Sequence, residues 1–141
     1  TVEVYDPATN AWSQAPPMGT ARSGPGVAAL GGKLYAVGGG NDDEHALSCA
    51  EVFDPQTQTW APIASMSTER KFAMVAAVQG KLYAAGGDDV GDGGEGNVQR
   101  SVEAYDPQKN RWDAVASMDR EHDVGAVPGN QVVLPSCLPP P

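Results

Sequence analysis

One block of sequence occurs three times in this chain, with the same internal order and spacing. Its clearest marker is an aromatic-Asp-Pro triplet, followed by a tryptophan and then a methionine. The first copy shifts by 48 residues to give the second, and the second by 52 to give the third; the marker positions are Asp6, Trp12, Met18, Asp54, Trp60, Met66, Asp106, Trp112 and Met118. Several positions that shift by one common step define an internal repeat, and a period of about 50 residues is typical of propellers.

Each repeat predicts four short antiparallel strands. In the first complete repeat, the apolar runs 26–30 and 33–37 flank the turn Gly31-Gly32, and a second hairpin surrounds Asp54-Pro55. Proline ends a strand because it has no N–H for the ladder, and the preceding carboxylate can accept N–H groups two residues on. The glycines after residue 37 let a neighbouring backbone come close. The recurring aromatic residues are expected to pack between adjacent blades.

The repeats divide the chain into five predicted units. Residues 1–21 are an incomplete unit with an outer hairpin, 22–69 and 70–121 are complete repeats, 122–134 begin another unit, and 135–141 form a proline-rich tail. The fold class is therefore all-β, with blades of four antiparallel strands. Closed propellers have about 4–8 blades, so we expect a partial propeller: a fragment of a longer ring, or a half-ring that pairs with a second copy as a homodimer. Thr1 stands inside a strand pattern without a leader, so we expect a cut rather than a natural start.

The net charge, the hydrophobic runs and the cysteines limit the possible partners and the compartment. The net charge of -9 and a pI near 4.4 argue against nucleic acid or an anionic membrane as partners. No apolar run approaches the roughly 20 residues that span a bilayer. Cys49 and Cys137 give neither a disulfide framework nor a metal-binding spacing, which predicts a reducing, cytoplasmic compartment.

In this order, the Leu-Tyr strand, the paired glycines, the aromatic-Asp-Pro hairpin and the following Trp, Met and Arg resemble the Kelch repeat. The resemblance extends to about Val127 and is closest to the Kelch-like (BTB-Kelch) proteins, in which a BTB domain and a helical segment precede the propeller. It implies a protein–protein interaction module, the substrate-recognition part of a cullin-3 ubiquitin-ligase adaptor. Cullin-3 would be reached through a BTB domain that these residues do not include. The alternative that the resemblance leaves open is an actin-binding or scaffolding protein without a ligase role.

The candidate binding surface is one edge of the predicted blades, which we call the loop face. In a meander alternate connections share an edge, so the acidic loops 41–48 and 88–100 join the segments 18–23, 66–71 and 118–123. In Kelch-like relatives this edge binds a short peptide, often through the residue after the motif Arg and the loop after Gly-Gly. Our candidate partner-binding residues are Arg22, Ser23, Asn41, Asp42, Arg70, Lys71, Asp88, Asp89, Arg120 and His122. In the alternative interpretation, the arginines pin loops to neighbouring blades and the acids confer solubility.

The sequence offers little for an enzyme. His45, His122 and the two cysteines are scattered, and we find no ligand cluster, no Gly-x-Ser-x-Gly motif and no phosphate-binding loop. We therefore predict no catalytic residue, no metal and no cofactor. A metal-dependent Kelch-fold enzyme is the least favoured alternative.

Overall fold

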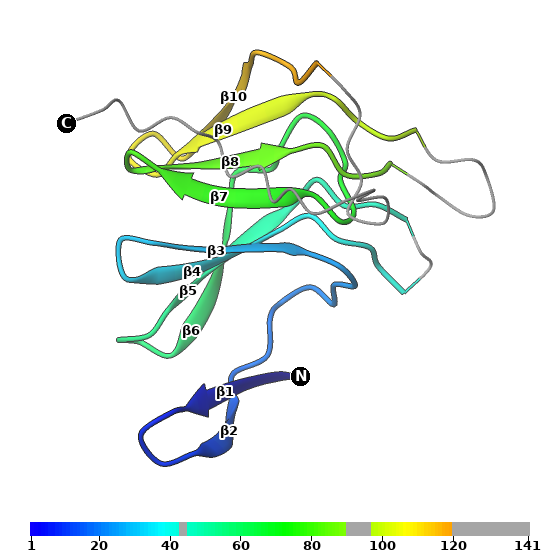
Figure 1. Cartoon of the computed structure of the whole chain (residues 1–141). Helices are drawn as coiled ribbons and strands as arrows, with labels where there is room; N and C mark the ends of the chain where they lie inside the picture. Colours follow the sequence, from blue (N-terminus) through cyan, green and yellow to red (C-terminus); the bar gives the residue numbers. More distant parts are fainter. Residues whose placement is uncertain (43–44, 90–96, 120–141) are drawn as a thin grey trace.

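The computed structural model describes residues 1–42, 45–89 and 97–119, and within these ranges it contains ten β-strands (Figure 1). The strands form one two-stranded hairpin and two four-stranded sheets, all antiparallel. The predicted all-β class with four-stranded antiparallel blades is confirmed. The predicted unit 122–134 and the tail 135–141 lie outside the described residues. No helix in the described part is long and apolar enough to cross a membrane.

The N-terminal hairpin pairs β1 (Val2–Asp6) with β2 (Ala11–Ala15) and forms a sheet of its own. Its turn has the predicted Asp-Pro chemistry. The Asp6 carboxylate accepts the N–H of Ala8 at 2.8 Å, and Asp54 accepts the N–H of Gln56 at 2.9 Å in the next copy. The proline has no N–H with which to continue the ladder, and this hydrogen bond gives the next N–H of the turn a partner.

Two blades follow the hairpin, and each is a meander in which strands pair in sequence order. We call the first sheet blade I and the second blade II. Blade I consists of β3 (Gly26–Leu30), β4 (Lys33–Val37), β5 (Ala50–Asp54) and β6 (Thr59–Ile63). Blade II consists of β7 (Met74–Val78), β8 (Lys81–Ala85), β9 (Val102–Asp106) and β10 (Arg111–Val115).

The hydrophobic core lies between the two blades, because each sheet buries one face against the other. Its buried members come from both sheets and from the connection between them: Tyr35, Val37, Ala50, Met66, Leu82, Ala84, Tyr105 and Trp112. Strand β3 contacts β7 and β8, so the inner strands of the blades lie closest together (Figure 1).

The recurring aromatic residues pack within a blade as well as between blades. The Tyr105 and Trp112 rings are 5.1 Å apart on paired strands of blade II, and the Phe53 and Trp60 rings are 5.2 Å apart in blade I. Between blades, the rings of Tyr35 and Tyr105 lie 6.1 Å apart. The expected inter-blade packing is therefore present, together with cross-strand pairs inside each blade.

Candidate functional site: the loop face

The loop face is formed by the connections β2–β3, β4–β5, β6–β7 and β8–β9, which meet at one edge of the blades. Short backbone bridges hold them together. Ser23 and Gly40 exchange two hydrogen bonds of 2.8 and 2.7 Å, and Lys71 and Asp88 exchange two of 2.8 Å. In each repeat, the residue after the motif arginine therefore pairs with the residue after Gly-Gly. The sequence predicted that these segments share an edge, and the structure brings them together.

A buried ion pair underlies each of these bridges. In blade I, Arg22 donates from Nη2 to Glu51 Oε1 at 2.9 Å and from Nη1 to the carbonyl oxygens of Gly38 and Cys49. The Arg22 side chain is fully buried, and that of Glu51 is 6% exposed. The guanidinium thus links the turn after β4 to the start of β5.

Blade II repeats this arrangement. Arg70 donates from Nη2 to Glu103 Oε1 at 3.2 Å and to Ser101 Oγ at 2.7 Å, and from Nη1 to the carbonyl oxygens of Gly86 and Ser101. The Arg70 side chain has no exposed surface. Arg22 and Arg70 therefore lie beneath the loop face, where they bind loop carbonyls and a glutamate. Their contact with a partner stays an untested prediction.

Both buried glutamates stay ionised because hydrogen bonds outweigh their desolvation. Burial by itself would raise the pKa of Glu51, but hydrogen bonds from Arg22 and from the amides of Gly19 and Thr20 lower it below 4.5. Likewise, burial opposes ionisation of Glu103, while bonds from Ser67 and Arg70 lower its pKa. Beneath the loop face, each buried glutamate is thus paired with a buried arginine, and the two charges neutralise each other.

Two of the predicted contact residues shape the loops that carry them. Asn41 Oδ1 accepts the N–H of His45 at 2.9 Å, and Asp89 Oδ1 accepts the N–H of Asn97 at 2.9 Å. Asn41 and Asp89 occupy equivalent positions, 48 residues apart, and both close a loop on itself. One side-chain oxygen of each residue therefore accepts a hydrogen bond from its own loop.

The remaining candidates differ in exposure. Ser23 and Asp42 are exposed, Asp88 is half-buried, and Lys71 is buried with only 8% of its surface exposed. Arg120 and His122 lie outside the described residues. The described loop face therefore presents hydroxyl and carboxylate groups above the buried arginines, and partner contact by any of these residues remains a prediction.

Phe72 is a loop-face residue that the sequence reasoning missed. It is 45% exposed and has φ 57°, a left-handed conformation that is costly for an aromatic residue. Its N–H bonds to the carbonyl of Gly24 at 3.0 Å, and Lys71 Nζ lies 5.5 Å from its ring centroid. A signal was available in the sequence, because Phe72 stands where the preceding repeat has Gly24.

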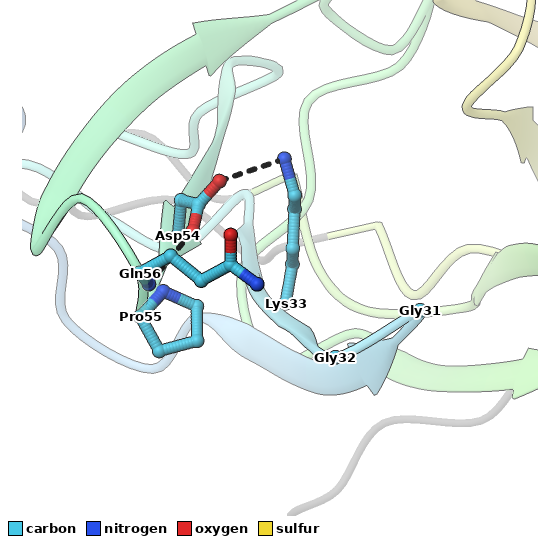
Figure 2. Close-up of a pocket in the computed structure, with 6 residues that line it drawn as sticks. All are labelled: Gly31, Gly32, Lys33, Asp54, Pro55 and Gln56. Carbon is cyan, nitrogen blue, oxygen red and sulfur yellow. Dashed lines mark hydrogen bonds and ion pairs between the residues drawn. The ribbon is translucent and has the colours of Figure 1, made fainter.

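A separate hollow lies at the opposite edge of blade I, between the β3–β4 and β5–β6 turns (Figure 2). The ammonium group of Lys33 and the carboxylate of Asp54 form an ion pair of 3.0 Å across it. Blade II repeats the pair as Lys81 and Asp106 at 3.8 Å. Because this ion pair recurs with the turns, we interpret the hollow as a consequence of blade geometry. Among the described residues, no group of three or more His, Cys, Asp or Glu side chains could hold a metal.

Four-stranded antiparallel blades with inter-blade tryptophans and paired glycines at one edge define a repeat β-propeller. The profile of the Kelch motif matches residues 1–19, 21–67 and 69–119, so the chain belongs to the Kelch-repeat family. The solved structure of YjhT superimposes with a TM-score of 0.76 at 16% identity, covering 86% of this chain and 40% of that one. This likeness supports the propeller fold.

Curated relatives match over single stretches. The chain is 51% identical over 49 residues to a mouse (Mus musculus) influenza virus NS1A-binding protein homolog, and 52% over 44 residues to human Kelch-like protein 31. It is 42% identical over 45 residues to zebrafish (Danio rerio) Kelch-like ECH-associated protein 1A. These matches cover 35%, 31% and 32% of this chain but only 8%, 7% and 8% of the relatives. The chain therefore corresponds to a small part of each relative.

Proposed function

We propose that this chain is a non-catalytic protein-interaction module whose loop face binds a peptide segment of a partner protein. The observation that carries the proposal is Phe72, an exposed aromatic side chain with a strained backbone, in the connection that also carries the buried Arg70. Such a side chain is a suitable anchor, because aromatic residues dominate binding energies and a fixed one loses little entropy on binding. The exposed carboxylate of Asp42 on the same face favours a partner segment with a basic residue beside an apolar one.

Within this proposal, the partner is a substrate of a cullin-3 ubiquitin ligase, and the chain acts in the cytoplasm as the recognition part of the adaptor. The support is similarity to Kelch-like protein 31 and Kelch-like ECH-associated protein 1A. Two further relatives carry names that state binding to influenza virus NS1A, which supports protein binding in general. An actin-binding or scaffolding role is the second candidate. Assembly as a homodimer is also part of the proposal, and its interface is derived below.

Peptide selection tests the binding surface. Short random peptides are selected against the immobilised chain, and their dissociation constants are measured for the original chain, Phe72→Ser and Asp42→Lys. We expect each variant to weaken binding by about tenfold or more, the effect of one lost anchor contact. The matched control is Asp113→Lys, the same change at an exposed acid outside the loop face. Selected peptides that bind all four proteins equally would contradict the proposal.

Cullin-3 and actin distinguish the two roles. The ligase role predicts co-purification of cullin-3 with the longest natural polypeptide that contains these residues. Cosedimentation of the same polypeptide with purified actin filaments, together with the absence of cullin-3, would favour the cytoskeletal role instead.

A further inference from the structure

Each of the two complete repeats holds its tryptophan by a hydrogen bond to the backbone of the preceding connection, an arrangement that we call the socket. In blade II, Trp112 Nε1 donates to the carbonyl of Ala64 at 2.8 Å, and Asn110 Oδ1 accepts the N–H of the same Ala64 at 2.9 Å. Two side chains of one hairpin thus grip one residue of the preceding connection. Only 9% of the Trp112 surface remains exposed.

The socket has a second form one repeat earlier. Trp60 Nε1 donates to the carbonyl of Pro16 at 2.9 Å, but Pro16 has no N–H to offer. The position of Asn110 is here Gln58, whose side chain donates to Pro55 O instead. In the first form, Asn110 and Trp112 both bond to an alanine. In the second form, Trp60 bonds to a proline and Gln58 replaces the asparagine.

The third tryptophan has an open socket. Trp12 is 67% exposed, and within the described residues its Nε1 has no acceptor. Asn10 has the left-handed φ of 53° and accepts the Tyr5 hydroxyl at 2.7 Å, just as Asn110 has φ 47° and accepts the Tyr105 hydroxyl. The N-terminal hairpin therefore presents the Asn form of the gripping pair, ready for a residue that has an N–H.

The matching residue is at the other end of the described chain. Ala116 follows β10 at the position that Ala64 holds after β6, 52 residues earlier, and it is exposed. Because it is an alanine, it offers both the carbonyl oxygen and the N–H that the Asn form requires. The chain thus carries both halves of one socket on separate surfaces.

We propose that Trp12 and Asn10 of one copy grip Ala116 of a second copy of this chain, head to tail. Trp12 Nε1 donates to the Ala116 carbonyl, and Asn10 Oδ1 accepts the Ala116 N–H. Each copy supplies three sheets, the hairpin and the two blades, and each sheet takes the place of one blade in a ring. Two copies therefore supply six blade places, within the range of about 4–8 for closed propellers. A head-to-tail contact closes into a ring when the rotation allows, and the pair then contains two identical interfaces.

A second contact is compatible with this arrangement but weaker. Glu3 is exposed and bonds to Gln14, whereas its counterparts Glu51 and Glu103 accept amides of the preceding connection. The amide of Asp119 stands at the position of those donors. The Asp119 carboxylate repels Glu3, however, so we assign the affinity to the Trp12 socket. Trp12, Asn10 and Ala116 lie outside the proposed peptide-binding surface, so the inference rests on the homodimer part of the proposed function and is independent of peptide binding.

Sedimentation equilibrium of the 141-residue chain over a wide concentration range tests the inference. We expect a closed pair. Trp12→Phe removes the indole N–H, and Asn10→Gln removes the acceptor; Gln58 adopts φ 58°, so glutamine fits this backbone. Each variant should weaken one interface about fivefold, the usual contribution of a hydrogen bond, and the pair about 25-fold because it has two interfaces.

A double variant makes the test specific. Asn10→Gln with Ala116→Pro recreates the Gln58–Pro16 form, and it should weaken the pair no more than either single change, because both remove the same hydrogen bond. Val27→Ser removes an exposed apolar side chain elsewhere (51% exposed) and should leave the pair unchanged. A monomer at every concentration, open-ended growth with concentration, or a pair that Trp12→Phe and Asn10→Gln leave unaffected would overturn the inference. Peptide binding by the loop face is measured separately, so failure here would overturn the homodimer and leave the proposed peptide binding intact.

Discussion

At the scale of single residues, the two buried Arg–Glu pairs hold the connections of the loop face together. Arg22 and Arg70 each bind a glutamate and two backbone carbonyls, and each pair links segments about thirty residues apart. A buried ion pair adds little net stability relative to apolar residues, because desolvation offsets attraction. Its main effect is geometric: only one arrangement of the loops satisfies both charges.

Removing one partner of the pair should destabilise the chain strongly. Arg70→Met leaves Glu103 buried without its counter-ion, and we expect a loss of about 3 kcal/mol or more in the free energy of unfolding measured with urea. The matched change Arg111→Met breaks an exposed pair with Asp113, with side chains 61% and 49% exposed, and should cost about 0.5 kcal/mol or less. Equal losses in the two variants would mean that the loops are held by other contacts.

The same glutamates predict acid sensitivity. The folded state lowers the pKa of Glu51 and Glu103, so it binds fewer protons than the unfolded state and their contribution is complete above the ordinary value of 4.5. Stability should therefore be lost as the pH falls below 4.5 through the folded-state pKa values. Urea unfolding at a series of pH values measures this slope. Glu103→Gln should be less stable at pH 7 and have a shallower acid slope; an unchanged slope would exclude Glu103 as a source.

At the scale of elements, the glycine pairs that end β4 and β8 set how close the blades lie. A Cβ on Gly38 would lie 2.3 Å from the Arg70 carbonyl oxygen, and one on Gly87 would lie 2.7 Å from that of Lys71. Both glycines also have positive φ. The expected close approach of a neighbouring backbone is therefore present at Gly38 and Gly87. At both glycines the neighbouring backbone is the β6–β7 connection, which carries Arg70.

Two alanine variants separate backbone conformation from close approach. Gly38→Ala places a side chain at a positive φ and also against the Arg70 carbonyl. Gly32→Ala places one at φ 75° with no atom within 4 Å of the added Cβ, so it has only the conformational cost. We expect a loss of about 1–2 kcal/mol for Gly32→Ala and distinctly more for Gly38→Ala, both by urea unfolding. Equal losses would show that the blades can move apart without penalty.

The strands, turns and blade class were predictable because their causes are local. The Asp6 turn, the glycine turn at 31–32 and the strand alternation each depend on a few adjacent residues. The burial of Arg22 was not predicted, because it depends on Glu51, which is remote in sequence. A signal existed, since Glu3, Glu51 and Glu103 recur in phase with the repeat. Phe72 was missed for a related reason: its N–H bonds to the carbonyl of Gly24, which is remote in sequence.

At the scale of the whole molecule, the hairpin is attached less firmly than the blades. Its ring pair, Tyr5 and Trp12, is 42% and 67% exposed, whereas the equivalent Tyr105 and Trp112 are 3% and 9% exposed. Among the described contacts, Trp60 holds the hairpin's exit at Pro16, and Glu51 binds the amides of the same connection. Stability is therefore expected to be unequal along the chain, lowest in the hairpin and highest where the two blades meet.

Hydrogen exchange should reveal this inequality and its dependence on pairing. In dilute solution, where the chain is monomeric, amides of β1 and β2 should exchange about 100-fold faster than those of β8 and β9, because the hairpin opens without disrupting the core. At concentrations that favour the pair, Trp12 and Asn10 are held by a second copy, and protection of the hairpin should rise while that of β8 and β9 changes little. The matched control is Asn10→Gln, which should reduce the rise. Exchange measured by mass spectrometry that shows equal protection of hairpin and blades in dilute solution would mean that contacts within one chain already fix the hairpin.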